Sequence, residues 1–343
     1  MKLYDCINQG KPYFIAEMSA NHCGQLDLAF KIIEGVAAAG ADCLKIQTYT
    51  ADTLTLNCSS EPYMIRGGLW AGYNYYRLYQ EAYTPWEWQK DIQDKCRECG
   101  LDFLSTPFDN TAVDFLETLN IEFYKIASFE LVDIPLIEYI ASKGKPMIIS
   151  TGMGSEEEIH DALNACYRCG NDQVVLLKCC SQYPAIPEDM NLSAIPLMKK
   201  TFGVPVGLSD HSFGFMAPVL AVSMGASVIE KHVCLSRDIK GPDSGFSMEL
   251  NEYAEMVKQV NLAVKILGKP SLELTDHDKE SRGGRRSLAA CKVIRKGDVF
   301  TSDNVRSVRP AVGIAPKYYR GLIGRTAKRD YRFGDGISID EMD

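Results

Sequence analysis

Short apolar runs recur eight times in the first 232 residues, each bounded by polar residues, glycine or proline. Their length and their content of β-branched and aromatic residues are typical of buried strands. The pattern therefore predicts eight strands, at Tyr13–Met18, Asp42–Gln47, Asp102–Thr106, Glu122–Ala127, Pro146–Ser150, Gln173–Cys179, Pro205–Ser209 and Ser227–His232.

Helical patterns lie between most of these strands. Leu26–Ala39 carries apolar residues at helical spacing and ends at Gly40, and Ala217–Met224 ends at Gly225. Ser155-x-x-Glu158 is a capping box that begins a third helix. Eightfold alternation of strand and helix predicts an α/β protein built as a (β/α)8 TIM barrel. A doubly wound open sheet is the alternative, but the count of eight and the absence of GxGxxG after the first strand disfavour it.

One spacing is too long for a simple barrel loop. About 50 residues separate the second strand from the third, and they are rich in tryptophan and tyrosine, including Trp70, Tyr73 and Trp86. A loop that follows a barrel strand lies on the face where such enzymes carry their sites, so a lid or a subunit contact is one interpretation. A locally packed excursion without a chemical role is the other.

The pattern changes after a long helix, Leu250–Leu267, that ends at Gly268. We expect a barrel domain over residues 1–270, a polar linker over 271–284 and a small second domain over 285–343. The second domain contains a weak repeat, in which Lys296–Val305 resembles Phe333–Met342 at an offset of 37 residues. Each copy predicts a turn, a short strand and a capped helical turn.

Composition narrows the class of protein. The chain of 343 residues is 46% hydrophobic and 24% charged, which is typical of a globular protein with a sizeable core. Its net charge of −8 disfavours nucleic acid as a partner, although residues 285–343 hold 13 basic and 7 acidic residues. No apolar run predicts a membrane span or an export signal. Twelve cysteines without such a signal predict free thiols in the cytoplasm.

Ionisable and hydroxyl side chains follow the expected strands in succession, and we take this as the main sign of an enzyme. His211 and His232 close neighbouring strands, about 4.8 Å apart, and could bind one divalent cation, Mn²⁺ or Mg²⁺, together with water and substrate. Lys45 and Lys125 are interpreted as anchors for an anionic ligand, with a Schiff-base nucleophile as the alternative. Two CxxC pairs, at Cys96 and Cys166, are interpreted as buried apolar residues, because their helices would not be neighbours.

Several motifs in order resemble the sialic acid synthase family over essentially the whole chain. They are Ile15–His22, Lys45-Ile46-Gln47-Thr48, Ser105–Asp109, Tyr124–Ser128, Ser150–Met153, Gly207–His211 and Glu230-Lys231-His232. Residues 286–310 are similar to that family's antifreeze-like (SAF, β-clip) domain. Within the family, residues 19–22, 69–70, 83–88 and 305–310 look more like the pseudaminic acid branch than the N-acetylneuraminate branch.

The resemblance implies a metal-dependent condensation of phosphoenolpyruvate with an acetamido-sugar aldehyde and water, here 2,4-diacetamido-2,4,6-trideoxy-L-altrose. It implies catalytic roles for Glu17 and Glu130 and metal ligation by His211 and His232. The residues that it assigns to phosphoenolpyruvate are Lys45, Thr106, Lys125, Ser128, Ser150, Ser181 and Ser209. Tyr183 and Asp243 would contact the acceptor sugar, as would Arg309 of the partner subunit in a domain-swapped homodimer.

Alternatives stay open at this point. Ser181 and Arg285 depart from the neuraminate pattern, which speaks against the neuraminate acceptor. Legionaminic or N-acetylneuraminic acid synthesis by the same chemistry remains a second hypothesis, because one or two pocket contacts contribute only about 1–3 kcal/mol of discrimination. A class I lyase that uses Lys45 or Lys125 as a Schiff base is a third. A non-catalytic sugar-binding or ice-binding protein is the fourth, although such a protein has no need for lysine and histidine at barrel strand ends.

Overall fold

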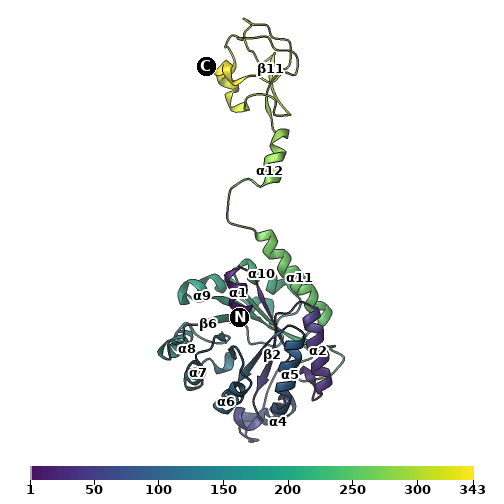
Figure 1. Ribbon diagram of the computed structural model, residues 1–343, viewed down its shortest axis with the longest axis vertical. Coiled ribbons are helices and arrows are strands. Elements are labelled where there is room, and N and C mark those ends of the chain that lie inside the picture. The colour runs from purple at the N-terminus through teal and green to yellow at the C-terminus, as the bar shows by residue number, and fades with distance from the viewer. Residues whose placement is uncertain (1) are drawn as a thin grey trace. The chain divides into compact units, whose positions relative to one another are not determined.

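The computed structural model describes residues 2–343. They form two compact units, and the boundary along the chain lies between Gly268 and Lys269 (Figure 1). In the larger unit eight parallel strands pair in sequence order, and β8 pairs with β1, so that the barrel closes. The strands are β1 (Tyr13–Glu17), β2 (Cys43–Thr48), β3 (Asp102–Pro107), β4 (Tyr124–Ile126), β5 (Met147–Ser150), β6 (Val174–Cys179), β7 (Val206–Asp210) and β8 (Val228–Cys234). The predicted TIM barrel is confirmed.

Helices surround the strands on the outside, as Figure 1 shows for the larger unit. They are α2 (Leu26–Ala38), α5 (Trp86–Glu98), α6 (Asn110–Thr118), α7 (Ile134–Ala141), α8 (Glu156–Arg168), α9 (Ala194–Phe202), α10 (Met216–Ser223) and α11 (Leu250–Leu267). The helix α8 begins at the predicted capping box, where Ser155 Oγ accepts from the backbone of Glu158. Apolar side chains between these helices and the strands form the main core.

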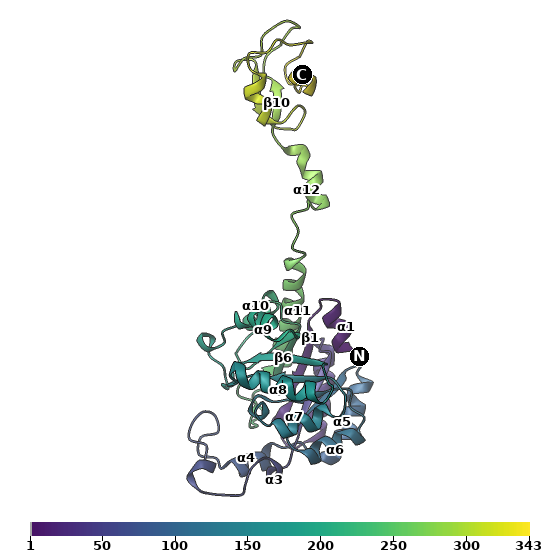
Figure 2. The ribbon, with the colours of Figure 1, turned by 90° about the vertical axis from the view of Figure 1, so that its left-hand side faces the viewer.

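The loop between β2 and α5 carries α3 (Ala51–Leu54) and α4 (Tyr75–Ala82) and projects from one end of the barrel (Figure 2). Trp86 Nε1 at its far end donates to the carbonyl of Tyr49, 3.1 Å away. His22 Nε2 and Thr84 Oγ1 lie 3.2 Å apart, which ties the same end to the 3₁₀ helix η1 (Ser19–His22). The long spacing in the sequence is therefore an insertion on the carboxyl side of β2.

A second core fills the inside of the barrel at the amino ends of the strands. It includes Tyr13, Ile15, Phe123 and Ile148, and Leu3 of α1 (Lys2–Asn8) packs into it. Barrel interiors are packed in this way rather than open. This end is closed, and any site inside the barrel opens at the other end.

The smaller unit contains an antiparallel pair, β10 (Ser287–Ala290) and β11 (Val305–Val308), around its own core. The two copies of the predicted repeat share their turn: Gly297 and Gly334 have φ of 95° and 88°. In addition, Asp298 accepts from the backbone of Arg295, and Asp335 accepts from the equivalent Arg332.

The shorter elements complete the fold. They are β9 (Met248–Glu249), which pairs with β8, α12 (Asp276–Ser281), which lies inside the segment predicted as a linker, and α13 (Tyr319–Leu322). Among residues 2–343, no helix has both the length and the apolarity that a membrane crossing needs.

Candidate active site

Along each barrel strand, the inward positions change from apolar to mostly polar side chains over a step of two residues. On β1 the apolar Ile15 is followed by Glu17, and on β4 Phe123 is followed by Lys125. Because side chains alternate with a period of two, each pair points to the same side of its strand. The same step recurs as Cys43 to Lys45, Leu104 to Thr106, Ile148 to Ser150, Leu177 to Cys179, Gly207 to Ser209 and Val228 to Glu230. A polar layer therefore lies above the apolar interior core.

Four charged side chains of this layer form one buried cluster. Lys45 Nζ lies 2.9 Å from Glu17 Oε2 and 3.2 Å from Glu230 Oε1. Lys125 Nζ lies 3.8 Å from the same Glu230 oxygen. Each of the four is at most 5% exposed, so their charges interact with little screening by water. Two cations and two anions balance one another until a charged ligand enters.

The two carboxyl groups of the cluster have pKa values shifted in opposite directions, and so do the two lysines. Burial raises the pKa of Glu17, although Lys45 opposes it, whereas the two lysines hold the pKa of Glu230 below its usual value against the effect of burial. Burial disfavours the charge of Lys45, but its two carboxylate partners raise its pKa above the ordinary value. Burial lowers the pKa of Lys125 to about 8. Lys45 is thus a permanent cation, which suits an anchor and not a Schiff-base nucleophile.

One hydroxyl contacts Lys125, and two more converge at Gly152. Lys125 Nζ donates to Ser150 Oγ over 2.7 Å, and Ser128 Oγ accepts from the backbone N–H of Gly152 over 3.0 Å. A Cβ on Gly152 would lie 2.8 Å from Ser128 Oγ and would overlap Ser181 Oγ. The missing side chain therefore lets two hydroxyls converge beside a cation, as a phosphate or carboxylate ligand requires.

The two remaining hydroxyls that the sequence predicted for this site also face the barrel interior. Ser209 Oγ donates to Glu230 Oε1 over 3.1 Å. Thr106 Oγ1 is buried and has no hydrogen-bond partner within the described part of the chain. A buried polar group without a partner is costly, so a ligand that accepts from Thr106 would relieve that cost.

The two predicted metal ligands lie side by side on neighbouring strands, with ring centroids 5.4 Å apart. His211 Nδ1 donates to the Cys180 carbonyl over 2.9 Å, which leaves Nε2 of the neutral ring with a free lone pair. The contacts with Cys179 and Cys180 raise the pKa of His211 against the effect of burial, so a cation at Nε2 must displace a proton at low pH. His232 Nδ1 is buried with no partner in residues 2–343, and burial and the nearby cations hold its pKa well below the usual range. A carbonyl on the second nitrogen and a neutral ring are what a ligating imidazole needs.

The donor set fits a divalent cation that takes its other ligands from solvent and substrate. No group of three histidine, cysteine or carboxylate side chains converges as a metal site in the described chain. Two imidazoles with open positions are typical of a catalytic site and not of a structural one.

Glu130 lies in the 3₁₀ helix η3 (Ser128–Glu130), at the carboxyl side of β4. Burial raises its pKa to about 7, with Lys125 opposing the shift. Its Oε2 is buried and has no hydrogen-bond partner among the described residues. A carboxyl group that changes protonation near neutral pH is suited to general acid–base catalysis.

The residues predicted to contact the acceptor fall into two groups. Tyr183 packs on His211 with ring centroids 4.2 Å apart, and Asp243 Oδ2 accepts from the backbone of Ala20 over 3.3 Å. Both belong to the barrel unit, on the side of the two histidines. Arg309 belongs to the smaller unit, where its side chain is exposed.

The sequence analysis gave no role in the site to three residues that the structure places there. Glu230 holds both lysines, Gln47 Nε2 donates to Glu17 Oε1 over 2.9 Å, and Cys179 Sγ lies 3.9 Å from His211 Nδ1. That contact lowers the pKa of the thiol to about 7, against the effect of burial. The two-residue step from the inward apolar positions could have found Glu230 and Cys179, and one more such step beyond Lys45 reaches Gln47.

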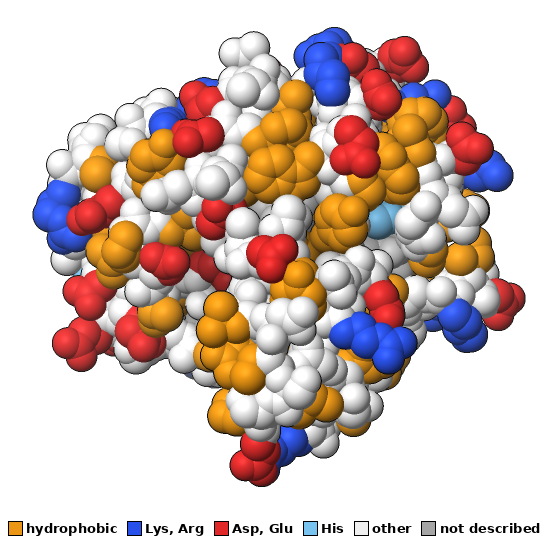
Figure 3. All heavy atoms as spheres, turned by 90° about the horizontal axis from the view of Figure 1, so that it is seen from below, with side chains coloured by type: hydrophobic (Ala, Val, Ile, Leu, Met, Phe, Trp, Pro, Cys, Tyr) orange, Lys and Arg blue, Asp and Glu red, His pale blue; other side chains and the backbone are white. Residues whose placement is uncertain are grey.

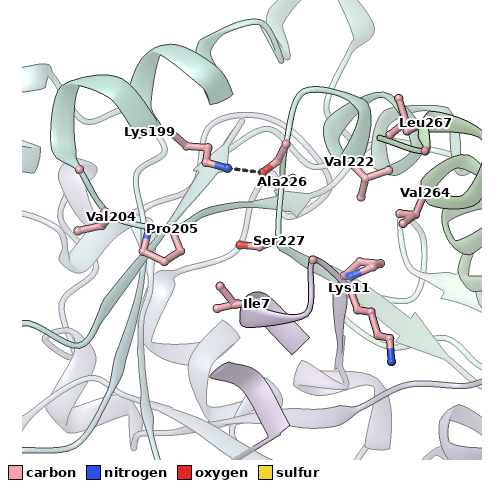
Figure 4. A pocket seen from close by; sticks show the side chains of 15 residues that line it. Ile7, Lys11, Lys199, Val204, Pro205, Val222, Ala226, Ser227, Val264 and Leu267 are labelled. Carbon is pink, nitrogen blue, oxygen red and sulfur yellow. Dashed lines mark hydrogen bonds between the residues drawn. The ribbon is translucent and has the colours of Figure 1, made fainter. Parts of the chain in front are cut away.

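The two ends of the barrel differ. Figure 3, a view from below Figure 1, shows a face with one histidine among hydrophobic side chains and with charges of both signs scattered over it. A cavity of about 620 Å³ lies elsewhere (Figure 4). Its lining includes Pro12, Pro205 and Ser227, which directly precede β1, β7 and β8. It is therefore at the amino ends of the strands, away from the charged cluster.

Comparison with known proteins agrees with this geometry. Residues 32–271 match the model of the NeuB family, and residues 285–341 match the SAF domain. The chain is 46% identical to the pseudaminic acid synthase of Campylobacter jejuni, over 95% of each protein. It is 40% identical to the pseudaminic acid synthase of Helicobacter pylori, over 97% of this chain and 98% of the relative.

Among solved structures, the N-acetylneuraminic acid (sialic acid) synthetase of Leptospira borgpetersenii, in complex with citrate, is similar with a TM-score of 0.71 and 32% identity. The match covers 79% of this chain and 90% of that one. The expected family and the expected SAF domain are both confirmed. This chain belongs to the NeuB family and carries a SAF domain behind its barrel.

Proposed function

We propose that this chain is a pseudaminic acid synthase, a transferase that condenses phosphoenolpyruvate with 2,4-diacetamido-2,4,6-trideoxy-L-altrose and water and releases phosphate by C–O cleavage. The observation that carries the proposal is the pair of buried lysines, Lys45 and Lys125, beside converging hydroxyls and a histidine pair. The two relatives named above bear that name at 46% and 40% identity, whereas the sialic acid synthetase is 32% identical.

Phosphoenolpyruvate carries a phosphate and a carboxylate, and the polar layer has donors for both. Lys45 and Lys125 supply the positive charge, Ser150 supplies a neutral donor at Lys125, and Ser128 and Ser181 supply two more at Gly152. Thr106 and Ser209 add two further hydroxyls to the polar layer. Binding of the anion competes with Glu17 and Glu230 for the two lysines, and the raised pKa of Glu17 allows that carboxyl to take up a proton in response.

The reaction balances without an oxidant or reductant. C3 of phosphoenolpyruvate forms a bond to the aldehyde carbon, and the aldehyde oxygen takes up a proton. Water then adds to C2 and loses a proton, and the tetrahedral intermediate expels phosphate with its bridging oxygen to leave the α-keto acid. Glu17 and Glu130 handle these protons, since burial places both pKa values above the ordinary range.

A divalent cation, Mn²⁺ or Mg²⁺, completes the proposal. His211 and His232 would hold it, and when bound it would supply Lewis-acid polarisation of a carbonyl oxygen. The protein's part is to hold His232 in its neutral form and to fix the His211 ring through the Cys180 carbonyl.

The acceptor would lie between the histidine pair and Tyr183, within reach of Asp243. The proposal includes a domain-swapped homodimer, in which Arg309 from the SAF domain of one chain contacts the acceptor in the barrel of the other. The support is chemical: Arg309 is exposed on its own unit, and a guanidinium is the side chain that matches an amide oxygen and a hydroxyl together. Twelve free thiols favour a cytoplasmic location.

The proposal is tested with phosphoenolpyruvate that carries ¹⁸O at the bridging position. We expect phosphate release only when donor, acceptor and Mn²⁺ are all present, with the label in the phosphate. Label retained in the sugar acid would contradict C–O cleavage. Borohydride treatment with pyruvate separates the lyase hypothesis, because the synthase forms no trapped adduct at Lys125.

A further inference from the structure

The insertion between β2 and α5 contains a loop, residues 65–73, that is closed by backbone hydrogen bonds and carries one tryptophan that contacts the barrel unit. The backbone N–H of Ile65 donates to the carbonyl of Tyr73 over 2.9 Å, and that of Gly72 donates to the carbonyl of Ile65 over 2.8 Å. Gly68 and Gly72 have φ of 75° and 87°, which allows the chain to turn within this loop. Trp70 lies between them and is the residue that the loop presents.

Trp70 contacts two elements that are far from it in the sequence. Its ring lies 5.7 Å from Tyr183 and 6.2 Å from Phe246, measured between centroids. Its Nε1–H donates to the carbonyl of Pro242 over 2.9 Å, directly before Asp243. The indole is thus held by a hydrogen bond at its polar edge, while its apolar body faces the other two rings.

Trp70, Tyr183 and Phe246 together form what we call the aromatic wall. Tyr183 and Phe246 are 5.1 Å apart, and Phe246 lies 5.0 Å from His232. The wall therefore stands directly beside the two histidines, on the side where Asp243 lies. The site has an ionic part around Lys45 and Lys125 and an apolar part made by these three rings.

We propose that the aromatic wall selects the acceptor, with Trp70 as the residue that packs on its deoxygenated, methyl-bearing part. This inference rests on the proposed function, because it specifies the acceptor of that reaction. A methyl group gains by leaving water for an aromatic surface, whereas a hydroxyl placed against a ring face loses hydrogen bonds to water that the ring face does not replace. The wall thus favours a 6-deoxy, N-acetylated aldehyde over a sugar with a free C6 hydroxyl.

The test compares Trp70→Ala and Trp70→Phe with Trp86→Phe. Trp86 is a matched control, since it is a second tryptophan directly after the same insertion, at the start of α5, but packs on Phe115, with ring centroids 4.9 Å apart. We expect Trp70→Ala to raise the KM of the acceptor about tenfold and to leave the KM of phosphoenolpyruvate within about twofold. Trp70→Phe keeps a ring and should lie between Trp70→Ala and the wild type. An unchanged acceptor KM, or an equal rise in both KM values, overturns the inference.

A binding measurement separates this inference from the proposed reaction. The borohydride-reduced acceptor lacks the aldehyde and cannot react, so it can be titrated while tryptophan fluorescence is recorded. We expect a saturable change in the wild type and in Trp86→Phe and none in Trp70→Phe. That result without any turnover by the wild type would contradict the proposed function and leave the wall as a sugar subsite. A wild type without a response, or a Trp70→Phe variant with the same response, overturns the inference.

Discussion

Replacing Gly152 with alanine adds one methyl group at the point where two hydroxyls of the proposed donor site meet. The added Cβ would lie 2.8 Å from Ser128 Oγ and would overlap Ser181 Oγ, and real Cβ atoms essentially never come within 3.0 Å of another heavy atom. The φ angle of Gly152 is not in the left-handed region, so alanine can adopt the backbone conformation. The change therefore moves the hydroxyls and little else.

The expected magnitude follows from the hydrogen bonds that are lost. A hydrogen bond to a charged group contributes about 1.5–3 kcal/mol, and at least one of the two hydroxyls must turn away. We expect a loss of at least about 2 kcal/mol in binding of phosphoenolpyruvate, which corresponds to a Kd about 30-fold higher. Stability should change less than binding, because the crowded atoms are two small side chains.

Gly154→Ala is the matched control, since its added Cβ meets Leu131 Cδ2, an apolar side chain, two residues along the same loop. Calorimetric titration of both variants with phosphoenolpyruvate, together with their thermal unfolding, separates binding from stability. A Kd of Gly152→Ala within threefold of the wild type, or an equal loss in Gly154→Ala, would refute a donor site built on Ser128 and Ser181.

Three further predictions concern the acid, the metal and the SAF domain. Glu130 has a pKa of about 7 when folded, so the folded protein binds a proton that the unfolded chain has already lost. This group therefore lowers the free energy of unfolding by up to about 3 kcal/mol as pH rises from about 4.5 to 7. Glu130→Gln should abolish that contribution in denaturant titrations. Chelation should stop phosphate release, Mn²⁺ should restore it in the wild type but not in His211→Ala, and near-normal turnover by that variant would remove the metal assignment. Arg309→Ala should raise the acceptor KM far more than the donor KM in steady-state assays, and equal effects would speak against a role at the acceptor.

The barrel could be predicted because its strands repeat a simple signal. Eight short apolar runs, with helices that end at glycines such as Gly40 and Gly225, specify alternation, and closure follows from their number. The strand edges differ by one or two residues, as in β4, where pairing leaves only Tyr124–Ile126 in the ladder. The ends of a strand depend on which residues pair with the neighbouring strands, and a local sequence pattern holds no information about that pairing.

The site was predictable where a residue type has an obvious chemistry and less so where it depends on its neighbours. Lys45 and Lys125 stood out as cations in apolar strands, but their opposite pKa shifts depend on tertiary contacts. Lys45 pairs with both Glu17 and Glu230, which raises its pKa, whereas burial outweighs the effect of Glu230 at Lys125. Trp70 was visible in an aromatic segment and in the motif at residues 69–70, but neither gave it a place in the site. Its contact with Tyr183 joins residues more than 100 positions apart and exists only once the barrel has closed.

One comparison of acceptor sugars tests both the proposed reaction and its acceptor. Phosphate release from phosphoenolpyruvate with Mn²⁺ should be measured for three acceptors side by side: the diacetamido-trideoxy-altrose, its legionaminic-type manno isomer and N-acetylmannosamine. We expect phosphate release when all components are present and the highest kcat/KM for the altrose sugar. A preference for either other sugar would contradict the acceptor, and no release from folded, metal-loaded protein with any of the three would contradict the proposed reaction itself.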